Sequence, residues 1–396
     1  MNLIDRVVQL QAEIQAIRRD IHAHPELRFE ENRTSDIVAH RLAAWGIEVH
    51  RGIGRTGVVG VIRQGTGTAM VGLRADMDAL PIQEGNAFTH RSTHDGKMHA
   101  CGHDGHTAML LAAARCLVET RRFDGTVVLI FQPAEEGGAG AQRMIDDGLF
   151  QRFPCDAVFG MHNWPGMAVG RFAVASTAAM ASSNEFQIRV DGRGGHAALP
   201  HLAVDPVFVA VQIAQGLQGI VTRAKKPIDA AVLSITQIHG GDTLNVIPEF
   251  AQMSGTVRTL SDDVTALMEE RMRRVAQFTA EAHGATATVR FSRNYPPTVN
   301  HAEESAFAAA VMDEIVGAAN VVRGFEPTMG AEDFAFMLKV RRGAYVLIGN
   351  GDGAHRAAGH GLGPCTLHNP NYDFNDELIP LGATFWVRLA ERYLGR

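Results

Sequence analysis

Apolar and polar residues alternate along the chain with the periods of both helices and strands. Residues 3–22 carry apolar side chains at spacings of three and four, which predicts an amphipathic helix. Further helical patterns cover 34–45, 106–120, 141–150, 303–318 and the stretch from 376. Apolar runs typical of strands lie between them, at 56–64, 69–78, 126–132, 156–163 and 344–350. Because strands that alternate with helices build sheets covered by helices, we predict an α/β fold with a mostly parallel or mixed sheet.

The order of elements changes near residue 184. From there the pattern reads strand, helix, two strands, helix and strand, in the segments 184–192, 204–224, 230–241, 249–260, 262–284 and 285–293. This order is that of a small ferredoxin-like α+β domain, and turn-rich sequence flanks it at both ends. We therefore predict a catalytic domain formed by 1–183 and 294–396, with an inserted lid or dimerisation domain at 184–293.

The composition is that of a globular protein and excludes several partners. The 396 residues exceed one ordinary core, and 46% of them are hydrophobic. A formal net charge of −6 without a basic cluster argues against nucleic acid as a partner. No apolar run reaches the roughly 18 residues of a membrane span, and the amphipathic start does not have the pattern of a signal peptide. The four cysteines are irregularly spaced and form no disulfide framework, so we expect a cytoplasmic protein.

Four polar clusters stand out from the apolar pattern. They are RADMDALP at 74–81, HACGHDGH at 99–106, QPAEEGGAGA at 132–141 and MHNWPG at 161–166. Three of them directly follow a predicted strand, and open α/β sheets bind ligands outside the carboxyl ends of their strands. Carboxylates, imidazoles and a thiol gathered at that edge indicate a metal site.

Cys101 and His103 are the first candidate ligands. Side chains two residues apart in an extended segment point the same way. A thiolate can bridge two metal ions, and imidazole suits Zn, Mn, Ni or Co. The alternative is a loop whose histidines cap the helix that follows. Glu136, His162 and His368 favour the metal site, because each adds a ligand-type side chain in a predicted loop or at a strand end.

The acidic pair Glu135–Glu136 points to hydrolysis. Adjacent side chains diverge, so one carboxylate can hold a metal ion while its neighbour faces a water molecule that the ion acidifies. The alternative is a pair of acids that stabilises a helix N-terminus. The glycines after the pair favour the first interpretation, since they leave room for a substrate.

Motifs spread over nearly the whole chain support this chemistry. They occur in the order RRxIHxxPEL, RADMDALP, HACGHDGH, QPAEEGGAGA, MHNWPG, GGHAALPH, DTLNVIPE, GAEDFAFM and LHNPNYDFND. In this order they resemble the bacterial N-acyl-amino-acid amidohydrolases, a family with hippurate hydrolase, aminoacylase-type enzymes and plant indole-acetyl-amino-acid hydrolases. The resemblance implies the fold of di-metal aminopeptidases and the hydrolysis of an amide between an acyl group and an amino acid.

The resemblance also implies a ligand set. Two divalent ions (Zn, Mn, Co or Ni) would be held by Cys101, His103, Glu136, His162 and His368. Cys101 would bridge the two ions. Glu135 would act as general base and later protonate the leaving amine, and Asp78 would orient a ligand. Asp76 stands where more distant relatives carry a metal-binding histidine, so we do not count it as a ligand.

The predicted small domain contributes further candidates. By the resemblance, His196 in GGHAALPH would stabilise the oxyanion that develops on the scissile carbonyl, and Asn245 is a second candidate. In related proteins such residues can come from a partner subunit. Arg258 could bind a substrate carboxylate through two hydrogen bonds, or be a solvated arginine at a strand end. Glu332, from the other domain, could line the pocket or stabilise a helix N-terminus.

We therefore expect a metal-dependent hydrolase that acts on small N-acyl-amino acids. The nearest alternative is a dipeptidase or carboxypeptidase with the same chemistry, and a more distant one is a non-catalytic binding protein. Apolar positions over 204–221 indicate a homodimer formed through the small domain, although burial against its own sheet explains most of them. The motifs name neither the acyl group nor the metal.

Overall fold

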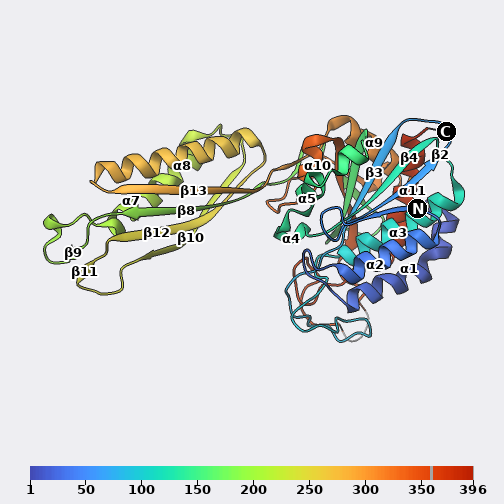
Figure 1. Ribbon diagram of the computed structural model, residues 1–396, viewed down its shortest axis with the longest axis horizontal. Coiled ribbons are helices and arrows are strands. Elements are labelled where there is room, and N and C mark those ends of the chain that lie inside the picture. The colour runs from blue at the N-terminus through green and yellow to red at the C-terminus, as the bar shows by residue number, and fades with distance from the viewer. Residues whose placement is uncertain (357–359, 396) are drawn as a thin grey trace. The chain divides into compact units, whose positions relative to one another are not determined.

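The computed structural model describes residues 1–356 and 360–395, and it divides into two compact units (Figure 1). The larger unit is formed by Met1–Ala179, Asn300–Glu326 and Asp333–Arg396. The smaller unit is formed by Met180–Val299 and Pro327–Glu332. Within the described ranges, none of the helices combines the length and the apolar character that crossing a membrane requires.

The larger unit is built on an eight-stranded mixed sheet in the order β1-β2-β4-β3-β5-β16-β6-β15. Its four central strands β4, β3, β5 and β16 run parallel, whereas β1, β2 and β6 form the antiparallel pairs β1-β2, β2-β4 and β16-β6. The strands are β1 (Glu48–Arg51), β2 (Val58–Gln64), β3 (Met70–Asp76), β4 (Gly125–Gln132), β5 (Ala157–Pro165), β6 (Phe172–Val174), β15 (Val321–Arg323) and β16 (Arg342–Gly351). Parallel strands are covered on both faces, which is why β4 is buried along its whole length. The predicted α/β fold is confirmed.

Helix α3 is the central helix of this unit. It is almost entirely buried, because it packs against the sheet and against the helices α1 and α11. Short helices follow β4 and carry the chain to β5. The helices are α1 (Asp5–Ala23), α2 (Asn32–Ala44), α3 (His103–Thr120), α4 (Glu135–Gly138), α5 (Gly140–Asp146), α6 (Leu149–Arg152), α9 (Ala302–Val316), η3 (Ala318–Asn320), α10 (Ala335–Val340) and α11 (Leu378–Tyr393).

The smaller unit has an antiparallel four-stranded sheet in the order β10-β12-β8-β13. Helices α7 and α8 pack on one face, where Ile188 and Met253 of the sheet meet Ile213 and Met268 of the helices. The chain order is the predicted strand-helix-strand-strand-helix-strand. Its elements are β8 (Ser183–Asp191), β9 (Gly195–His196), η1 (Pro200–Leu202), α7 (Pro206–Gly219), η2 (Ile220–Ala224), β10 (Ala231–Gly240), β11 (Val246–Ile247), β12 (Phe250–Thr259), α8 (Asp262–Ala282), β13 (Thr286–Tyr295) and β14 (Thr298–Val299), and β7 (Ala178–Met180) spans its boundary.

Three segments lie in a different unit from the one that we predicted. The sequence analysis left 180–183, 294–299 and 327–332 in the larger domain, but these residues belong to the smaller unit. The N–H of Ala181 donates to the carbonyls of Thr328 (3.1 Å) and Gly330 (2.8 Å). Backbone bonds between segments so far apart along the chain leave no local pattern in the sequence, so only the fold reveals them.

A buried ionic cluster connects α1 to α3 and to the residues before α11. Arg18 is fully buried and donates to Asp376 (2.8 Å) and Asp104 (3.2 Å). His22, one turn later, contacts Asp104 (2.9 Å) and Glu84 (3.3 Å). Burial alone would lower the pKa of His22, but the charge of Asp104 and the two hydrogen bonds outweigh it and raise that pKa to about 9. His22 is therefore a cation in the folded protein at neutral pH.

This cluster predicts how stability depends on pH. Since the pKa of His22 is raised from 6.5 to about 9, its contribution is fully present below pH 6.5 and is lost as the pH rises through 9. Chemical denaturation should show the free energy of unfolding falling by up to about 3 kcal/mol over this range. His22→Gln should flatten the slope, whereas His24→Gln, at the exposed end of α1, should not. Equal slopes for His22→Gln and the unsubstituted protein would contradict this assignment.

Candidate metal centre

The polar clusters meet at the carboxyl ends of the parallel strands. Asp76 ends β3, the Glu135–Glu136 pair follows β4, and His162 lies in β5. Cys101 precedes the first turn of α3, which begins at His103. The chain carrying His368 returns to the same place, because the His368 N–H donates to the carbonyl of Ala100 (2.8 Å). The sheet topology thus brings together residues from five separate stretches of the sequence.

The five predicted ligands form two overlapping groups. In one, ligand atoms of Cys101, His103 and His162 lie within 4.8 Å of one another, and in the other those of Cys101, Glu136 and His368 do. The Cys101 Sγ is 3.3 Å from His162 Nε2, and Glu136 Oε1 is 3.0 Å from His368 Nε2. Cys101 belongs to both groups, which is the position that a bridging thiolate would need.

The ring orientations fit metal binding. The Nδ1–H of His103 donates to Asp78 (3.2 Å), and the Nδ1–H of His162 donates to the carbonyl of Asn163 (2.6 Å). In both rings this leaves Nε2 for a metal ion: His103 Nε2 is buried without a hydrogen-bond partner among the described residues, and His162 Nε2 faces the Cys101 Sγ. In metal-binding histidines, a hydrogen bond from the ring nitrogen that does not bind the metal fixes the tautomer. The donor set therefore fits divalent ions.

The charges of the centre also favour a cation. Burial, together with the carboxylates of Glu136 and Glu135, holds the pKa of the Cys101 thiol well above its ordinary value. Burial keeps the pKa of His162 well below its ordinary value, so that ring is neutral. Burial also lowers the pKa of His103, but Asp76 and Asp78 outweigh it and raise that pKa to about 10. A bound cation would offset the buried negative charge and favour the thiolate.

Asp78 connects the ligands to the acidic pair. One of its oxygens accepts from the Glu135 N–H (3.0 Å) and from His103, and the other accepts from the Glu136 N–H (2.9 Å). The Glu135 side chain is buried, and its Oε1 accepts from the Asp333 N–H (3.3 Å). A ligand atom of Glu135 also lies within 4.8 Å of those of His103 and Glu136. The carboxylate of Glu135 is thus held beside the ligand cluster.

Asp76 has other partners in the structure. It accepts from Arg74 (2.7 Å) and from His106 Nδ1 (2.6 Å), and its nearer oxygen is 3.7 Å from His103 Nε2. The side chains of Asp76 and Arg74 are both fully buried. Its charge is therefore compensated by protein groups. Ligand atoms of Asp76, His103 and His106 also lie within 4.8 Å of one another, so leaving Asp76 out of the ligand set stays a prediction.

The sequence analysis did not anticipate a group of supporting residues. His106 Nε2 accepts from the Asn163 N–H (3.0 Å), and the Asn163 side chain donates to the carbonyl of Cys101 (2.7 Å). The Tyr372 hydroxyl in turn donates to Asn163 Oδ1 (2.9 Å). These bonds hold the loop that carries Cys101. Only their proximity in the sequence could have indicated these residues, since each lies within four residues of a predicted ligand.

The candidates of the smaller unit fall into separate places. His196 and Asn245 are neighbours, because β9 pairs with β11 and the Ala197 N–H donates to the Asn245 carbonyl (3.0 Å). Arg258 lies near the opposite end of β12 from them, roughly 25 Å away along the strand at 3.3 Å per residue. It is half-buried, and burial lowers its pKa. Glu332 is buried in the segment that joins the smaller unit, and its carbonyl accepts from Thr298 (3.3 Å).

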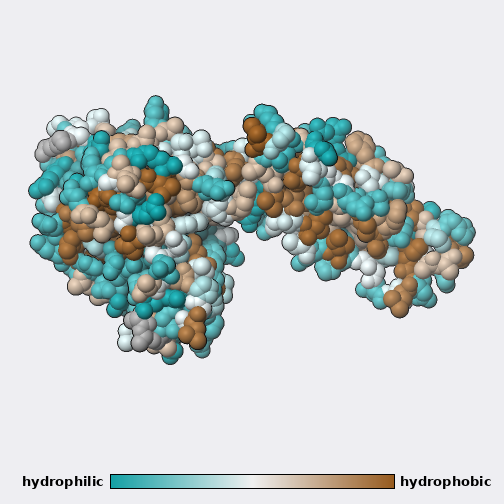
Figure 2. Space-filling view, turned by 180° about the vertical axis from the view of Figure 1, so that it is seen from behind, coloured by the Kyte–Doolittle hydropathy of each residue, from teal (hydrophilic) through white to brown (hydrophobic). Residues whose placement is uncertain are grey.

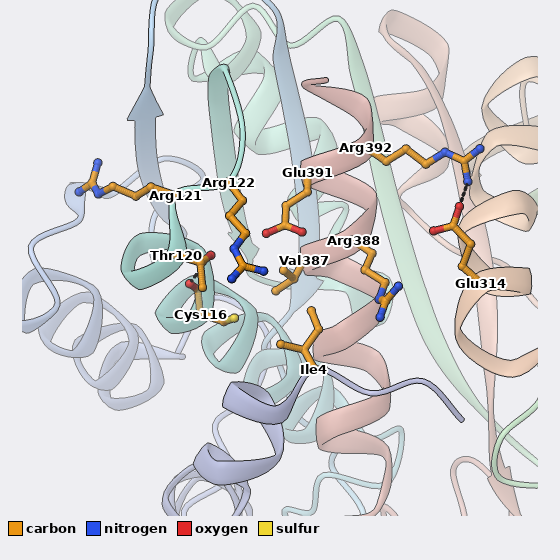
Figure 3. A pocket seen from close by; sticks show the side chains of 10 residues that line it. All are labelled: Ile4, Cys116, Thr120, Arg121, Arg122, Glu314, Val387, Arg388, Glu391 and Arg392. Carbon is orange, nitrogen blue, oxygen red and sulfur yellow. Dashed lines mark hydrogen bonds and ion pairs between the residues drawn. The ribbon is translucent and has the colours of Figure 1, made fainter. Parts of the chain in front are cut away.

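A cavity of about 890 Å³ in the larger unit contains none of the predicted site residues. Figure 3 shows Arg122 and Arg388 on either side of Glu391. Burial raises the pKa of Glu391, and the charges of the two arginines offset part of that increase. Arg392 pairs with Glu314 in the same wall. Glu391 and Glu314 thus offset part of the positive charge of the four arginines that line this cavity. Its lining is Ile4, Cys116, Thr120, Arg121, Arg122, Glu314, Val387, Arg388, Glu391 and Arg392.

Comparison with known proteins identifies the family. Residues 72–392 match the model of peptidase family M20/M25/M40. The chain belongs to this family. It is 40% identical over 394 residues to a hippurate hydrolase of Campylobacter jejuni, with 100% of both chains covered. It is 38% identical to thermostable carboxypeptidase 1 of Saccharolobus solfataricus, with 99% of each chain covered.

A solved structure of an M20 member agrees with the fold. The crystal structure of a dinuclear metal binding peptidase from Bacillus subtilis has a TM-score of 0.84 and 33% identity, and the match covers 98% of this chain and 99% of that one. The predicted family resemblance is confirmed. Together with the donor set described above, M20 membership supports divalent metal ions as the cofactor.

The ligand set predicts a specific response to metal. Because an ion binds only the folded site, Zn or Mn should raise the unfolding temperature of the chelator-treated protein by about 5 °C or more. Cys101→Ala and His368→Ala should each weaken metal binding by roughly 100-fold, measured by elemental analysis after dialysis. Cys155→Ala is the control, since Cys155 is buried outside both ligand groups. Equal metal content in Cys101→Ala and Cys155→Ala would contradict the ligand set.

Proposed function

We propose that this protein hydrolyses the amide bond of N-acyl-amino acids, with two divalent ions held by the five ligands and Glu135 as the general base. The observation that carries the proposal is the position of Glu135 next to a thiol, imidazole and carboxylate cluster: its N–H donates to Asp78, and its carboxylate accepts from the Asp333 N–H. The hippurate hydrolase that matches the full chain supports the substrate class, since hippurate is the N-benzoyl derivative of glycine.

The reaction divides between the ions and the protein. Zn, Mn, Co or Ni ions at the five ligands would polarise the acyl carbonyl and acidify a water molecule. Glu135 takes a proton from the attacking water and returns it to the leaving amine nitrogen. Asp78 orients His103 and fixes the backbone of the acidic pair, so that both carboxylates keep their positions through the cycle.

The smaller unit supplies the proposed substrate contacts. We assign His196 and Asn245 together to the scissile carbonyl, because the pairing of β9 with β11 makes them neighbours. Arg258 is assigned to the substrate carboxylate. Because it lies roughly 25 Å from His196 and Asn245 along one strand at 3.3 Å per residue, we propose that these two residues come from a partner subunit. The Arg258 side chain is half-buried and makes no hydrogen bond or ion pair to any described residue, so its guanidinium is available to a carboxylate. Glu332, which is buried, is assigned to the pocket wall.

A carboxypeptidase is the second candidate function. The thermostable carboxypeptidase that is 38% identical to this chain over nearly its whole length favours it. The two functions differ in the acyl side of the substrate, since a dipeptidase or carboxypeptidase accepts amino-acid residues there. Assays of hippurate, N-acetyl-amino acids and dipeptides with each metal distinguish them. Stoichiometric ligand binding without any product would instead indicate a non-catalytic binding protein.

We also propose a homodimer formed through the smaller unit. Figure 2 shows apolar side chains on the surface of the protein. The exposed apolar side chains of the smaller unit include Phe208 and Val211 of α7 and Ile238 of β10. β10 and β13 are the edge strands of the sheet. Arg273 donates to a carbonyl of β13 (2.7 Å), whereas no side chain of the described residues bonds to the backbone of β10. An uncovered edge beside an apolar helix face fits pairing with a second copy.

The cysteines support a location in a reducing compartment. All four are free and buried. We therefore propose the cytoplasm as the location of the protein.

The general base makes a direct prediction for activity. Glu135→Gln should lower kcat by about 10²- to 10⁴-fold, because the amide cannot accept the proton. Bound metal should stay at the level of the unsubstituted protein. Glu281→Gln, at an exposed acid on α8 of the smaller unit, is the matched control and should leave kcat unchanged. Near-normal turnover in metal-loaded Glu135→Gln would remove Glu135 from this role.

The dimer proposal predicts a change in mass. Val211→Glu should convert a dimer into a monomer in light scattering, because it places a charge in the apolar face beside β10. Phe278→Glu on α8, the helix next to the other edge, should leave the mass unchanged although Phe278 is equally apolar and exposed. A monomer for the unsubstituted protein, or a dimer for Val211→Glu, would contradict the proposed interface.

A further inference from the structure

Three successive backbone N–H groups of the turn that carries the acidic pair donate to carboxylates. The N–H groups of Glu135 and Glu136 donate to Asp78. The N–H of Ala134 donates to Glu31 Oε1 (2.9 Å). Ala134 has φ 54° and ψ 42°, the left-handed conformation, which is unfavourable for a residue with a Cβ. A left-handed alanine immediately before a predicted general base requires a contact that holds it there.

Glu31 provides that contact for more than one segment. The same oxygen accepts from the N–H of Phe29 (2.9 Å), which is also left-handed, with φ 62°. Its second oxygen accepts from the Thr56 hydroxyl. The Glu31 side chain is fully buried. A single carboxylate therefore connects the loop before α2, the segment before β2 and the turn after β4, and it holds two unfavourable backbone conformations.

The ordinary explanation for an acid at this position does not apply. Glu31 precedes the first residue of α2, but its side chain makes no bond to that helix. Glu26 caps the helix instead, because it accepts from the N–H groups of Arg33 (2.9 Å) and Thr34 (2.8 Å). The Glu31 carboxylate is thus directed to the turn after β4 and is not needed for α2.

Two further contacts bind the same loop to the turn. Arg28 Nη1 donates to the carbonyl of Glu136 (3.2 Å). A Cβ added to Gly138 would be 3.2 Å from the ring of Phe29, so the ring lies directly against the backbone of the turn. The loop from Arg28 to Glu31 therefore contacts the turn before, within and after the acidic pair.

We propose that Glu31 is a positioning residue for catalysis: its carboxylate holds Ala134 in the left-handed conformation and so aims Glu135. This proposal rests on the proposed function of Glu135 as general base. When the Ala134 N–H loses its anionic acceptor, the peptide before Glu135 can relax toward a right-handed or extended conformation. The Glu135 carboxylate then moves relative to the ligand cluster, and a shift of this kind lowers the rate of the chemical step with little effect on substrate binding.

The test combines two substitutions. Glu31→Gln keeps the shape of the side chain but removes its charge, and should lower kcat by between about 10- and 100-fold, with KM and bound metal nearly unchanged. Ala134→Gly removes the Cβ that makes the left-handed conformation unfavourable. The double variant should therefore recover kcat to within about threefold of Ala134→Gly alone. Assays run above pH 7, since burial and the charge of Asp78 raise the pKa of Glu31 to about 7.

A readout without substrate separates this proposal from the proposed function. Amide hydrogen exchange over residues 132–138 should become faster in Glu31→Gln and return toward the original rate in the double variant. The matched control is Glu26→Gln, which should lower the unfolding temperature through loss of the α2 cap but leave both kcat and this exchange unchanged. If the unsubstituted protein hydrolyses no N-acyl-amino acid, the proposed function fails while the exchange pattern still tests Glu31.

Other results would overturn the positioning role. A Glu31→Gln variant whose loss of kcat is not recovered by Ala134→Gly places the effect elsewhere. A variant that loses metal, or that fails to fold with and without Ala134→Gly, makes Glu31 a general stability residue. Unchanged kcat in a folded, metal-loaded Glu31→Gln also rejects the proposal.

Discussion

The carboxylate of Asp78 accepts hydrogen bonds from the ring of His103 and from the N–H groups of Glu135 and Glu136. These bonds join the first turn of α3 to the turn after β4, which are the two segments that carry most of the candidate chemistry. A buried carboxylate is stable only when donors surround it, so the three groups are held by the same energetic requirement that buries Asp78. The positions of a ligand and of the general base are therefore coupled through one side chain.

The centre as a whole is rich in buried negative charge. Protein cations compensate only part of it, as Arg74 does for Asp76. The thiol of Cys101 is kept protonated by burial and by the neighbouring carboxylates. Such a cluster is unfavourable without a cation, and the family to which the chain belongs supports divalent metal as that cation. Because Glu135 is buried, its hydrogen bond to the Asp333 N–H is stronger than the same bond would be in water.

The two units of the chain divide the proposed work. The larger unit holds the predicted ligands, the proposed base and its supporting carboxylates, most of them at the carboxyl ends of buried central strands. The smaller unit carries His196 and Asn245 on short strands, and it carries exposed apolar side chains next to an uncovered sheet edge.

The sequence by itself determined the element pattern, the α/β fold, the family and the set of chemical groups, because periodicity and motifs are local properties of the chain. It also identified Glu135 and the five ligand candidates by residue type and order.

Only the tertiary structure decided which groups share a hydrogen bond. Asp76 was compensated by Arg74 and His106, Asn163 and Tyr372 entered the support of Cys101, and 327–332 joined the smaller unit. Glu31 could not be read from the sequence, since an acid before a helix predicts a cap, and its bond to Ala134 spans 103 residues. Contacts between distant segments depend on strand order and backbone conformation, and neither leaves a local pattern in the chain.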